Sequence, residues 1–221
     1  AIGLPSLGSH DMVKKVVILM IAAGAYAVGF WPSWWVRDGV LKAFGNPAYE
    51  GVWILIPHVF LYTTLSALTC LVLWLALIQL KWLEPIPFAI SRSAVIWGLM
   101  GGIVGAVAAF GIFAGLQPGA VHAAQFNPWV ATANLFSNFY EEFVFRGFLL
   151  AALTAVLGFW PAAILSSVAF GATHEQYPLE FQAIISVFGL TWCWIVRRTG
   201  SIWSAWIAHM ALDWIVDPFV S

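Results

Sequence analysis

Apolar residues run along this chain in long stretches that are separated by short polar or Pro/Gly-rich breaks. A helix that crosses a bilayer needs about 20 mostly apolar residues. Seven stretches fit, although the fifth is short, ends in polar residues and is expected to span only in part. They cover about residues 13–36, 52–80, 93–116, 129–157, 161–175, 179–196 and 201–219. The pattern predicts an all-α polytopic membrane protein, a bundle of about seven transmembrane helices.

Composition agrees with a membrane protein. Of the 221 residues, 62% are hydrophobic and 9% are charged, against roughly 25% charged residues in soluble domains. A net charge of −1 provides no basic surface for nucleic acid, so the expected partners are the lipid bilayer and a substrate. Cys70 and Cys193 have neither disulfide-framework nor metal-ligand spacing.

The N-terminal residues have a composition of their own. Residues 1–11 include Gly8-Ser9-His10 and are expected to be an expression-vector remnant, with Met12 as the native start. A signal peptide is the competing interpretation. The apolar run continues past Trp34 without a small-residue cleavage site, which favours a retained first helix. Residues 12–221 are therefore predicted to form a single transmembrane helical domain.

Loop charges predict the orientation. With the N-terminus in the cytoplasm, six Lys and Arg residues lie on that side and two on the other, as the positive-inside rule requires. The cytoplasmic six are Lys14, Lys15, Lys81, Arg92, Arg197 and Arg198, against Arg37 and Lys42. The short chain and few charges favour a prokaryotic inner or plasma membrane.

The segment Glu141-Glu142-Phe143-Val144-Phe145-Arg146 is the strongest indication of function. Charge at membrane depth costs a few kcal/mol or more per residue and is rarely kept without a role. Neighbouring helical residues point about 100° apart, so Glu141 and Glu142 face different ways. Glu142 and Arg146, at i,i+4, can pair. Glu141 is then free to point into a cavity as a general base.

Polar residues extend this site along the same helix. Asn134, Ser137 and Asn138 precede Glu141 by seven, four and three residues and form a stripe on its side. A polar stripe in a membrane helix faces the bundle interior or water. The alternative interpretation is a structural polar seam.

Two later segments each carry one histidine. His174 closes the fifth segment, and His209 lies in the last, where Asp213 follows at i,i+4 and can orient its ring. Each has a structural alternative, an interfacial histidine for His174 and a polar pair between packed helices for His209. The small residues Ser204 and Ala208 predict that the last helix packs closely.

Three motifs follow one another in the chain: Glu-Glu-x-x-x-Arg (141–146), Phe-x-x-x-His (Phe170, His174) and His-x-x-x-Asp (His209, Asp213). Their order and spacing resemble those of the CAAX protease and bacteriocin-processing family. These are intramembrane proteases of the type II CAAX prenyl endopeptidase group. The resemblance covers about residues 129–217. One such motif is a weak signal, whereas three in order on successive polar-marked helices are a strong one. It implies an active site buried between the last four helices.

The resemblance also implies roles. Glu141 with His174 would activate water against a scissile carbonyl, and His209 with Asp213 would stabilise the oxyanion. Glu142 and Arg146 would hold the site in shape, with Phe170 in support. Asn138, from the polar stripe, is predicted to support the site as well. Many family members carry Asn where this chain has Asp213, and an ionised Asp can only accept hydrogen bonds. Either Asp213 is protonated or it orients His209, which then donates alone, and the helical spacing favours the second.

Together these features predict an intramembrane glutamate-type endopeptidase without a cofactor. It would cleave a membrane-associated peptide, whether CAAX-type, leader or signalling, and a prokaryotic source favours one without a prenyl group. A zinc hydrolase using Glu141, His174 and His209 is the nearest rival. A non-catalytic peptide-binding or immunity protein and a proton-coupled transporter stay open. A retinal photoreceptor is disfavoured, because no lysine follows Lys81. The oligomeric state has no sequence signal.

Overall fold

The structure, a computed structural model, describes residues 9–45, 50–56, 66–84, 88–117, 119 and 121–220, without the side chains of residues 9, 10, 28–38 and 40. Within these ranges all named elements are helical, and extended pairing is limited to an isolated bridge between Val121 and Val220. The elements are α1 (Ser9–Ala43), α2 (Val52–Ile56), α3 (Leu68–Gln79), α4 (Arg92–Leu116), α5 (Pro128–Glu142), η3 (Phe143–Leu149), α6 (Leu150–Leu157), α7 (Phe159–Ala172), α8 (Leu179–Thr199), α9 (Ile202–Val216) and η4 (Asp217–Phe219).

The predicted all-α fold is confirmed for the described residues, and the helices coincide with the apolar stretches. The predicted segment 129–157 corresponds to three consecutive helical elements, α5, η3 and α6. The prediction for 161–175 extends too far, because α7 ends at Ala172 and leaves His174 in the following turn. Residues 57–65 of the second predicted segment, together with His58, lie outside the described residues, as do residues 1–8 of the expected vector remnant and the side chain of Arg37.

Local sequence signals explain several boundaries. Asn127 caps α5, because its side-chain oxygen accepts hydrogen bonds from the backbone N–H groups of Trp129 and Val130 at 2.9 and 3.4 Å. Pro128 occupies the first turn, where its missing N–H costs nothing. Gly200 ends α8 in the left-handed conformation, with φ of 65°, which a glycine adopts without strain.

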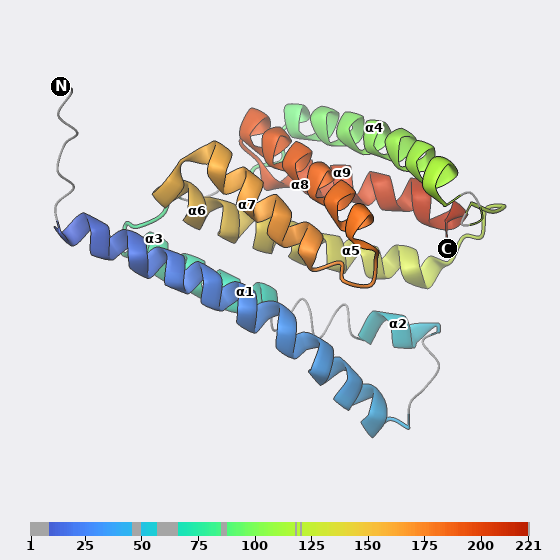
Figure 1. Ribbon diagram of the computed structural model, residues 1–221, viewed down its shortest axis with the longest axis horizontal. Coiled ribbons are helices and arrows are strands. Elements are labelled where there is room, and N and C mark those ends of the chain that lie inside the picture. The colour runs from blue at the N-terminus through green and yellow to red at the C-terminus, as the bar shows by residue number, and fades with distance from the viewer. Residues whose placement is uncertain are drawn as a thin grey trace.

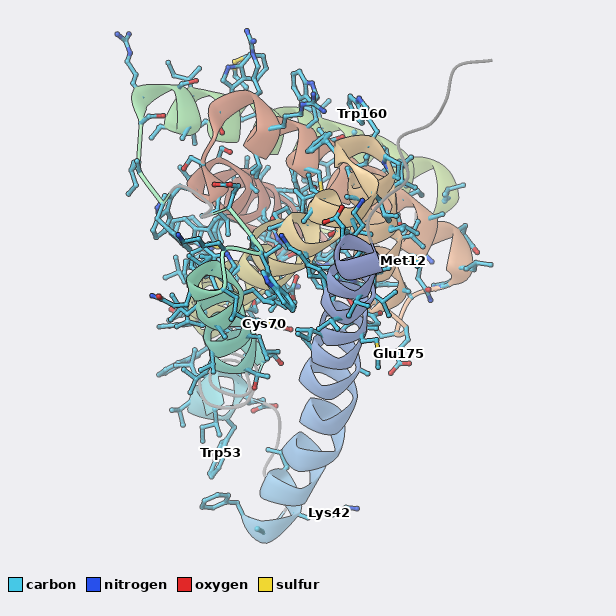
Figure 2. All side chains as sticks on the ribbon, turned by 90° about the vertical axis from the view of Figure 1, so that its left-hand side faces the viewer. Met12, Lys42, Trp53, Cys70, Trp160 and Glu175 are labelled. Atoms are coloured by element: carbon cyan, nitrogen blue, oxygen red, sulfur yellow. The ribbon has the colours of Figure 1, made fainter. Side chains whose placement is uncertain are left out.

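Helices α4 to α9 form the main bundle, and α1 and α3 lie together along one side of it (Figure 1). The first part of α1 packs on the bundle through Ile18, Ala22 and Ala25, which are buried. Lys42 lies near the far end of α1, well away from the bundle (Figure 2). The hydrophobic core draws residues from α1 and α3 as well as from η3 and α6–α9.

Small residues bring α4 and α9 close together. A Cβ atom at Gly98 would lie 2.8 Å from the backbone oxygen of Ser204, and one at Gly102 would lie 2.7 Å from that of Ala208. Ser204 and Ala208 are both fully buried. The closely packed face predicted for the last helix is thus present, and it fixes the position of His209 beside it.

The surface of the bundle is strongly apolar. Helices α4 and α8 are long and apolar enough to cross a bilayer. The exposed side chains of α4 include Leu99, Ile103, Val104 and Val107, between 46% and 69% accessible. An apolar surface of this kind needs lipid around it. These features and the overall composition identify an integral membrane protein.

Candidate active site

The predicted site residues come from four neighbouring parts of the bundle. The last turns of α5 and the start of η3 supply the two carboxylates and the arginine, α7 and its following turn supply the aromatic ring and one histidine, and α9 supplies the other histidine. The residues are Asn138, Glu141, Glu142, Arg146, Phe170, His174, His209 and Asp213.

A wide π-helical turn follows directly after the glutamate pair. In η3 the backbone bonds close larger rings than in an α-helix, a rare geometry that is frequent at functional sites. The carbonyl oxygen of Phe145 accepts a hydrogen bond from the Ser166 hydroxyl of α7 at 2.7 Å, so the turn is tied to its neighbour. Arg146 lies in this turn and is fully buried.

Glu142 is the centre of the buried polar network. Its Oε1 atom lies 3.1 Å from Nη1 of Arg146, which is the ion pair expected from the i,i+4 spacing. The same oxygen lies 2.9 Å from Nδ1 of His209. Glu142 and Arg146 are both completely buried. One carboxylate oxygen therefore holds side chains from two different elements.

Asp213 lies next to His209 and is held mainly by α5. Its Oδ2 atom accepts a hydrogen bond from Nδ2 of Asn138 at 2.7 Å. The distance from Nε2 of His209 to the same oxygen is 3.6 Å, too long for a good hydrogen bond. Helical spacing predicts that Asp213 orients His209, but in the structure the ring makes its short hydrogen bond to Oε1 of Glu142, and Asp213 lies further away.

Glu141 and His174 are less connected. Glu141 is half-buried, and no hydrogen bond joins it to His174 or His209, all three being described residues. Nδ1 of His174 lies 2.9 Å from the backbone oxygen of Phe170. The ring of Phe170 packs against both histidines, with centroids 4.8 Å from His174 and 5.8 Å from His209. The two histidines thus lie on one aromatic side chain.

Two residues of α8 join the network without having been predicted. Trp192 stacks on His209 with ring centroids 4.3 Å apart, and Gly189 faces the Arg146 guanidinium. The sequence contains 14 Trp and 19 Gly, and nothing in their spacing distinguishes these two.

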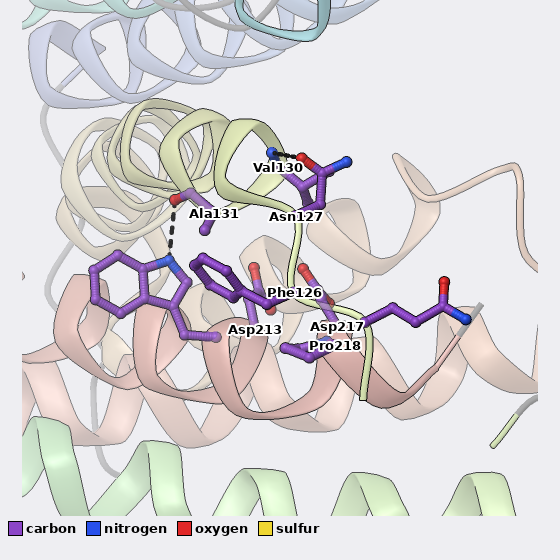
Figure 3. A pocket seen from close by; sticks show the side chains of 9 residues that line it. Phe126, Asn127, Val130, Ala131, Asp213, Asp217 and Pro218 are labelled. Carbon is purple, nitrogen blue, oxygen red and sulfur yellow. Dashed lines mark hydrogen bonds between the residues drawn. The ribbon is translucent and has the colours of Figure 1, made fainter. Parts of the chain in front are cut away.

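A small pocket opens at the end of the polar network. It is lined by Asp213 of α9, by Asp217 at the start of η4 and by residues that precede and begin α5, including Phe126 and Asn127 (Figure 3). Asp217 accepts a hydrogen bond from Asn134 at 2.7 Å, one turn along both helices from the Asn138–Asp213 bond. The pocket brings Asp213 into contact with the space outside the bundle.

The zinc alternative requires three ligating side chains that converge on one point. Across the described residues, no three His, Cys, Asp or Glu side chains converge as a metal site. Glu141, His174 and His209 therefore do not form a preassembled ligand set in this arrangement.

Comparisons with known proteins find a family model that matches the region of the site. Residues 123–215 match the family model described as type II CAAX prenyl endopeptidase Rce1-like. Over 76 residues, 34% of this chain, the sequence is 32% identical to the "Putative membrane peptidase YdiL" of Bacillus subtilis (strain 168). The chain spans about 30% of the length of that relative. No solved structure matches the chain significantly.

Fold, surface and site define a helical integral membrane protein with a buried cluster of carboxylates, histidines and an arginine. Residues 123–215, which contain all three motifs, carry the Rce1-like match. The resemblance to the CAAX protease and bacteriocin-processing family is thereby confirmed for this segment of the chain.

Proposed function

We propose that this protein is an intramembrane endopeptidase that cleaves a peptide near the membrane with water activated by Glu141 and His174. The observation that carries the proposal is the Glu142–Arg146–His209 network, which is buried in an apolar bundle directly beside Glu141. Charged groups at such depth are costly unless they are paired and used. The Rce1-like match over the same residues supports this reaction class.

Glu141 suits the role of general base because it is the less committed of the two glutamates. Glu142 already holds Arg146 and His209, whereas Glu141 is half-buried and has no hydrogen bond to either histidine. A water molecule held between Glu141 and His174 would lose its proton to the carboxylate and attack the scissile carbonyl carbon.

His209 suits the role of oxyanion donor. Its Nδ1 is engaged by Glu142 at 2.9 Å, while Nε2 lies 3.6 Å from Oδ2 of Asp213, too far for a good hydrogen bond. Nε2 can therefore turn its proton to the carbonyl oxygen as negative charge develops there. An imidazole that donates from both nitrogens is the imidazolium form. The carboxylates of Glu142 and Asp213 flank the ring, and the hydrogen bond from Asn138 holds the Asp213 carboxylate in place.

The wider architecture belongs to the same proposal. We place seven membrane-spanning segments in the chain, with the active site between the last four and the N-terminus in the cytoplasm of a prokaryotic cell. The substrate class is a membrane-associated peptide, of CAAX, leader or signalling type and without a prenyl group. No cofactor is invoked; zinc dependence and a purely peptide-binding role are the outcomes that would replace this mechanism.

The test is cleavage of a fluorogenic peptide library by the purified protein in lipid vesicles. Glu141→Gln removes the base and should abolish cleavage while the melting curve stays that of the wild type. Glu84→Gln, at an exposed loop residue, is the matched control and should cleave normally. Activity that survives in Glu141→Gln would remove Glu141 as the base.

Chelator separates the remaining alternatives in the same assay. Cleavage that persists in chelator supports water activation by Glu141 and His174. Cleavage that stops and returns with added zinc would assign the reaction to a metal hydrolase. Peptide binding without cleavage by the wild type would instead support the binding or immunity protein.

A further inference from the structure

Helix α8 passes directly behind the proposed site but contributes none of the three motifs. It packs against both α7 and α9 (Figure 1). Between Glu180 and Arg197 it contains no charged residue and no histidine. A contribution of α8 to the site therefore comes from uncharged side chains, through their shape, their polar atoms or their aromatic faces.

Trp192 touches two members of the buried network. Its ring is 2% exposed and stacks on the imidazole of His209 at 4.3 Å and 29°. The guanidinium carbon of Arg146 lies 5.1 Å from the centroid of the same ring. Phe170 meets Trp192 edge-on at 5.8 Å, so the indole is itself held in one orientation.

Arg146 depends on these aromatic faces because its hydrogen bonding is incomplete. Its Nη1 bonds to Glu142, but Nε and Nη2 are buried without a hydrogen-bond partner among the described residues. The guanidinium carbon lies 4.1 Å from the centroid of Phe170. A cation over an aromatic face is stabilised most when water is excluded, and Trp192 and Phe170 supply two such faces.

Gly189, one turn before Trp192, makes room for this arrangement. A Cβ atom there would lie 2.7 Å from Nη2 of Arg146 and 3.2 Å from Cδ1 of Phe170. Both neighbours are buried in the network and have little freedom to withdraw. A residue larger than glycine would displace the guanidinium from Glu142 or the ring from the histidines.

We propose that α8 positions the active site through Trp192 and Gly189, with Trp192 fixing the His209 ring and the Arg146 guanidinium against Glu142. The inference rests on the proposed peptidase function. Glu142 fixes one edge of the His209 ring, and Trp192 fixes its face. Together they prevent the ring from rotating away from the line along which Nε2 would meet the oxyanion, and a small loss of alignment lowers the rate of the chemical step.

The test measures kcat and KM separately, with a peptide found in the library assay. Trp192→Leu should lower kcat by about 10- to 100-fold, the range expected for loss of a buried cation–π and stacking contact, with little change in KM. Trp192→Phe restores an aromatic face and should recover most of kcat. Gly189→Ala should lower kcat as well.

Matched controls come from the same helix and from α4. Trp194 is two residues away, is 38% exposed and packs on Trp97 instead of the site, so Trp194→Leu should keep the wild-type kcat. Gly111 has no atom within 4 Å of an added Cβ, so Gly111→Ala should also be neutral. Melting curves for all variants, with assays run well below each transition, separate catalysis from stability.

The outcomes are distinguishable from failure of the proposed function. If wild type cleaves, Glu141→Gln does not, and Trp192→Leu keeps the wild-type kcat, the positioning inference is overturned while the peptidase stands. Equal losses in Trp192→Leu and Trp192→Phe, or an equal loss in Trp194→Leu, would also overturn it. Cleavage that Glu141→Gln leaves unchanged overturns the proposed mechanism itself.

Discussion

The buried ion pair between Glu142 and Arg146 makes a quantitative prediction about stability. Both side chains are completely buried, with Oε1 and Nη1 3.1 Å apart. Removing one partner of such a pair costs about 3–5 kcal/mol, because the other charge is left buried without it. After Arg146→Met, His209 still donates to Glu142 at 2.9 Å. We therefore expect the lower end of the range, about 3 kcal/mol.

A double-mutant cycle isolates the pair from other effects of these substitutions. Glu142→Gln together with Arg146→Met removes both charges, so the double variant should lose less stability than the sum of the single losses. The coupling energy should be about 2 kcal/mol, within the range for residues in one buried network. The measurement is the free energy of unfolding in mixed micelles titrated with a denaturing detergent, followed by circular dichroism.

An exposed pair on α1 provides the matched comparison. Asp11 and Lys15 have the same i,i+4 spacing at 4.0 Å, but their side chains are 50% and 33% accessible. Exposed pairs of this kind contribute about 0.3–0.5 kcal/mol, so the Asp11→Asn and Lys15→Met cycle should show little coupling. A coupling for Glu142 and Arg146 no larger than this would refute the view that the buried pair holds the site together.

Two further predictions concern packing and the α5–α9 contact. Gly102→Ala should lower the free energy of unfolding by about 1–3 kcal/mol, because its Cβ would lie 2.7 Å from the Ala208 backbone oxygen. The same micelle titration measures this loss. A loss no greater than that of Gly111→Ala would contradict the close α4–α9 contact. Asn138→Ala removes the 2.7 Å hydrogen bond to Asp213 and should lower kcat. Asn134→Ala removes a hydrogen bond of the same length to Asp217, which lies further from His209, and should leave kcat unchanged. Similar losses of kcat in both variants would contradict a special role for Asn138.

Periodic and local features of the chain were predictable because they depend on neighbours in sequence. Apolar stretches predicted the helices, and the i,i+4 spacing predicted the Glu142–Arg146 pair, since helical geometry alone brings such residues together. The polar stripe of α5 was equally visible: Asn138 hydrogen-bonds to Asp213 of α9, and Asn134 hydrogen-bonds to Asp217 at the start of η4. For these features, the contacts expected from the spacing in sequence are also present in the folded protein.

Features that depend on distant contacts were not predictable. The residues of the π-helical turn η3 are apolar apart from Arg146 and carry no sequence signal for this geometry. The carbonyl oxygen of Phe145 accepts a hydrogen bond from Ser166 of another helix. The hydrogen bond from His209 to Glu142 joins residues 67 positions apart, whereas helical spacing pointed to Asp213 as the partner. Trp192 likewise matters through its location behind the site, which no pattern in α8 reveals.

The arrangement also explains how charge can be kept in an apolar bundle. Glu142 accepts from Arg146 and His209 with one oxygen, and the rest of the guanidinium meets the rings of Phe170 and Trp192. Those same two rings pack on His209. The aromatic side chains therefore limit water around the network and orient the imidazole at once, and fixed groups in a water-poor site act more strongly on developing charge than they would in water. Trp192 and Phe170 both shield the charged groups from water and orient the His209 ring. Substitutions that remove their aromatic rings should therefore lower catalysis before they unfold the bundle.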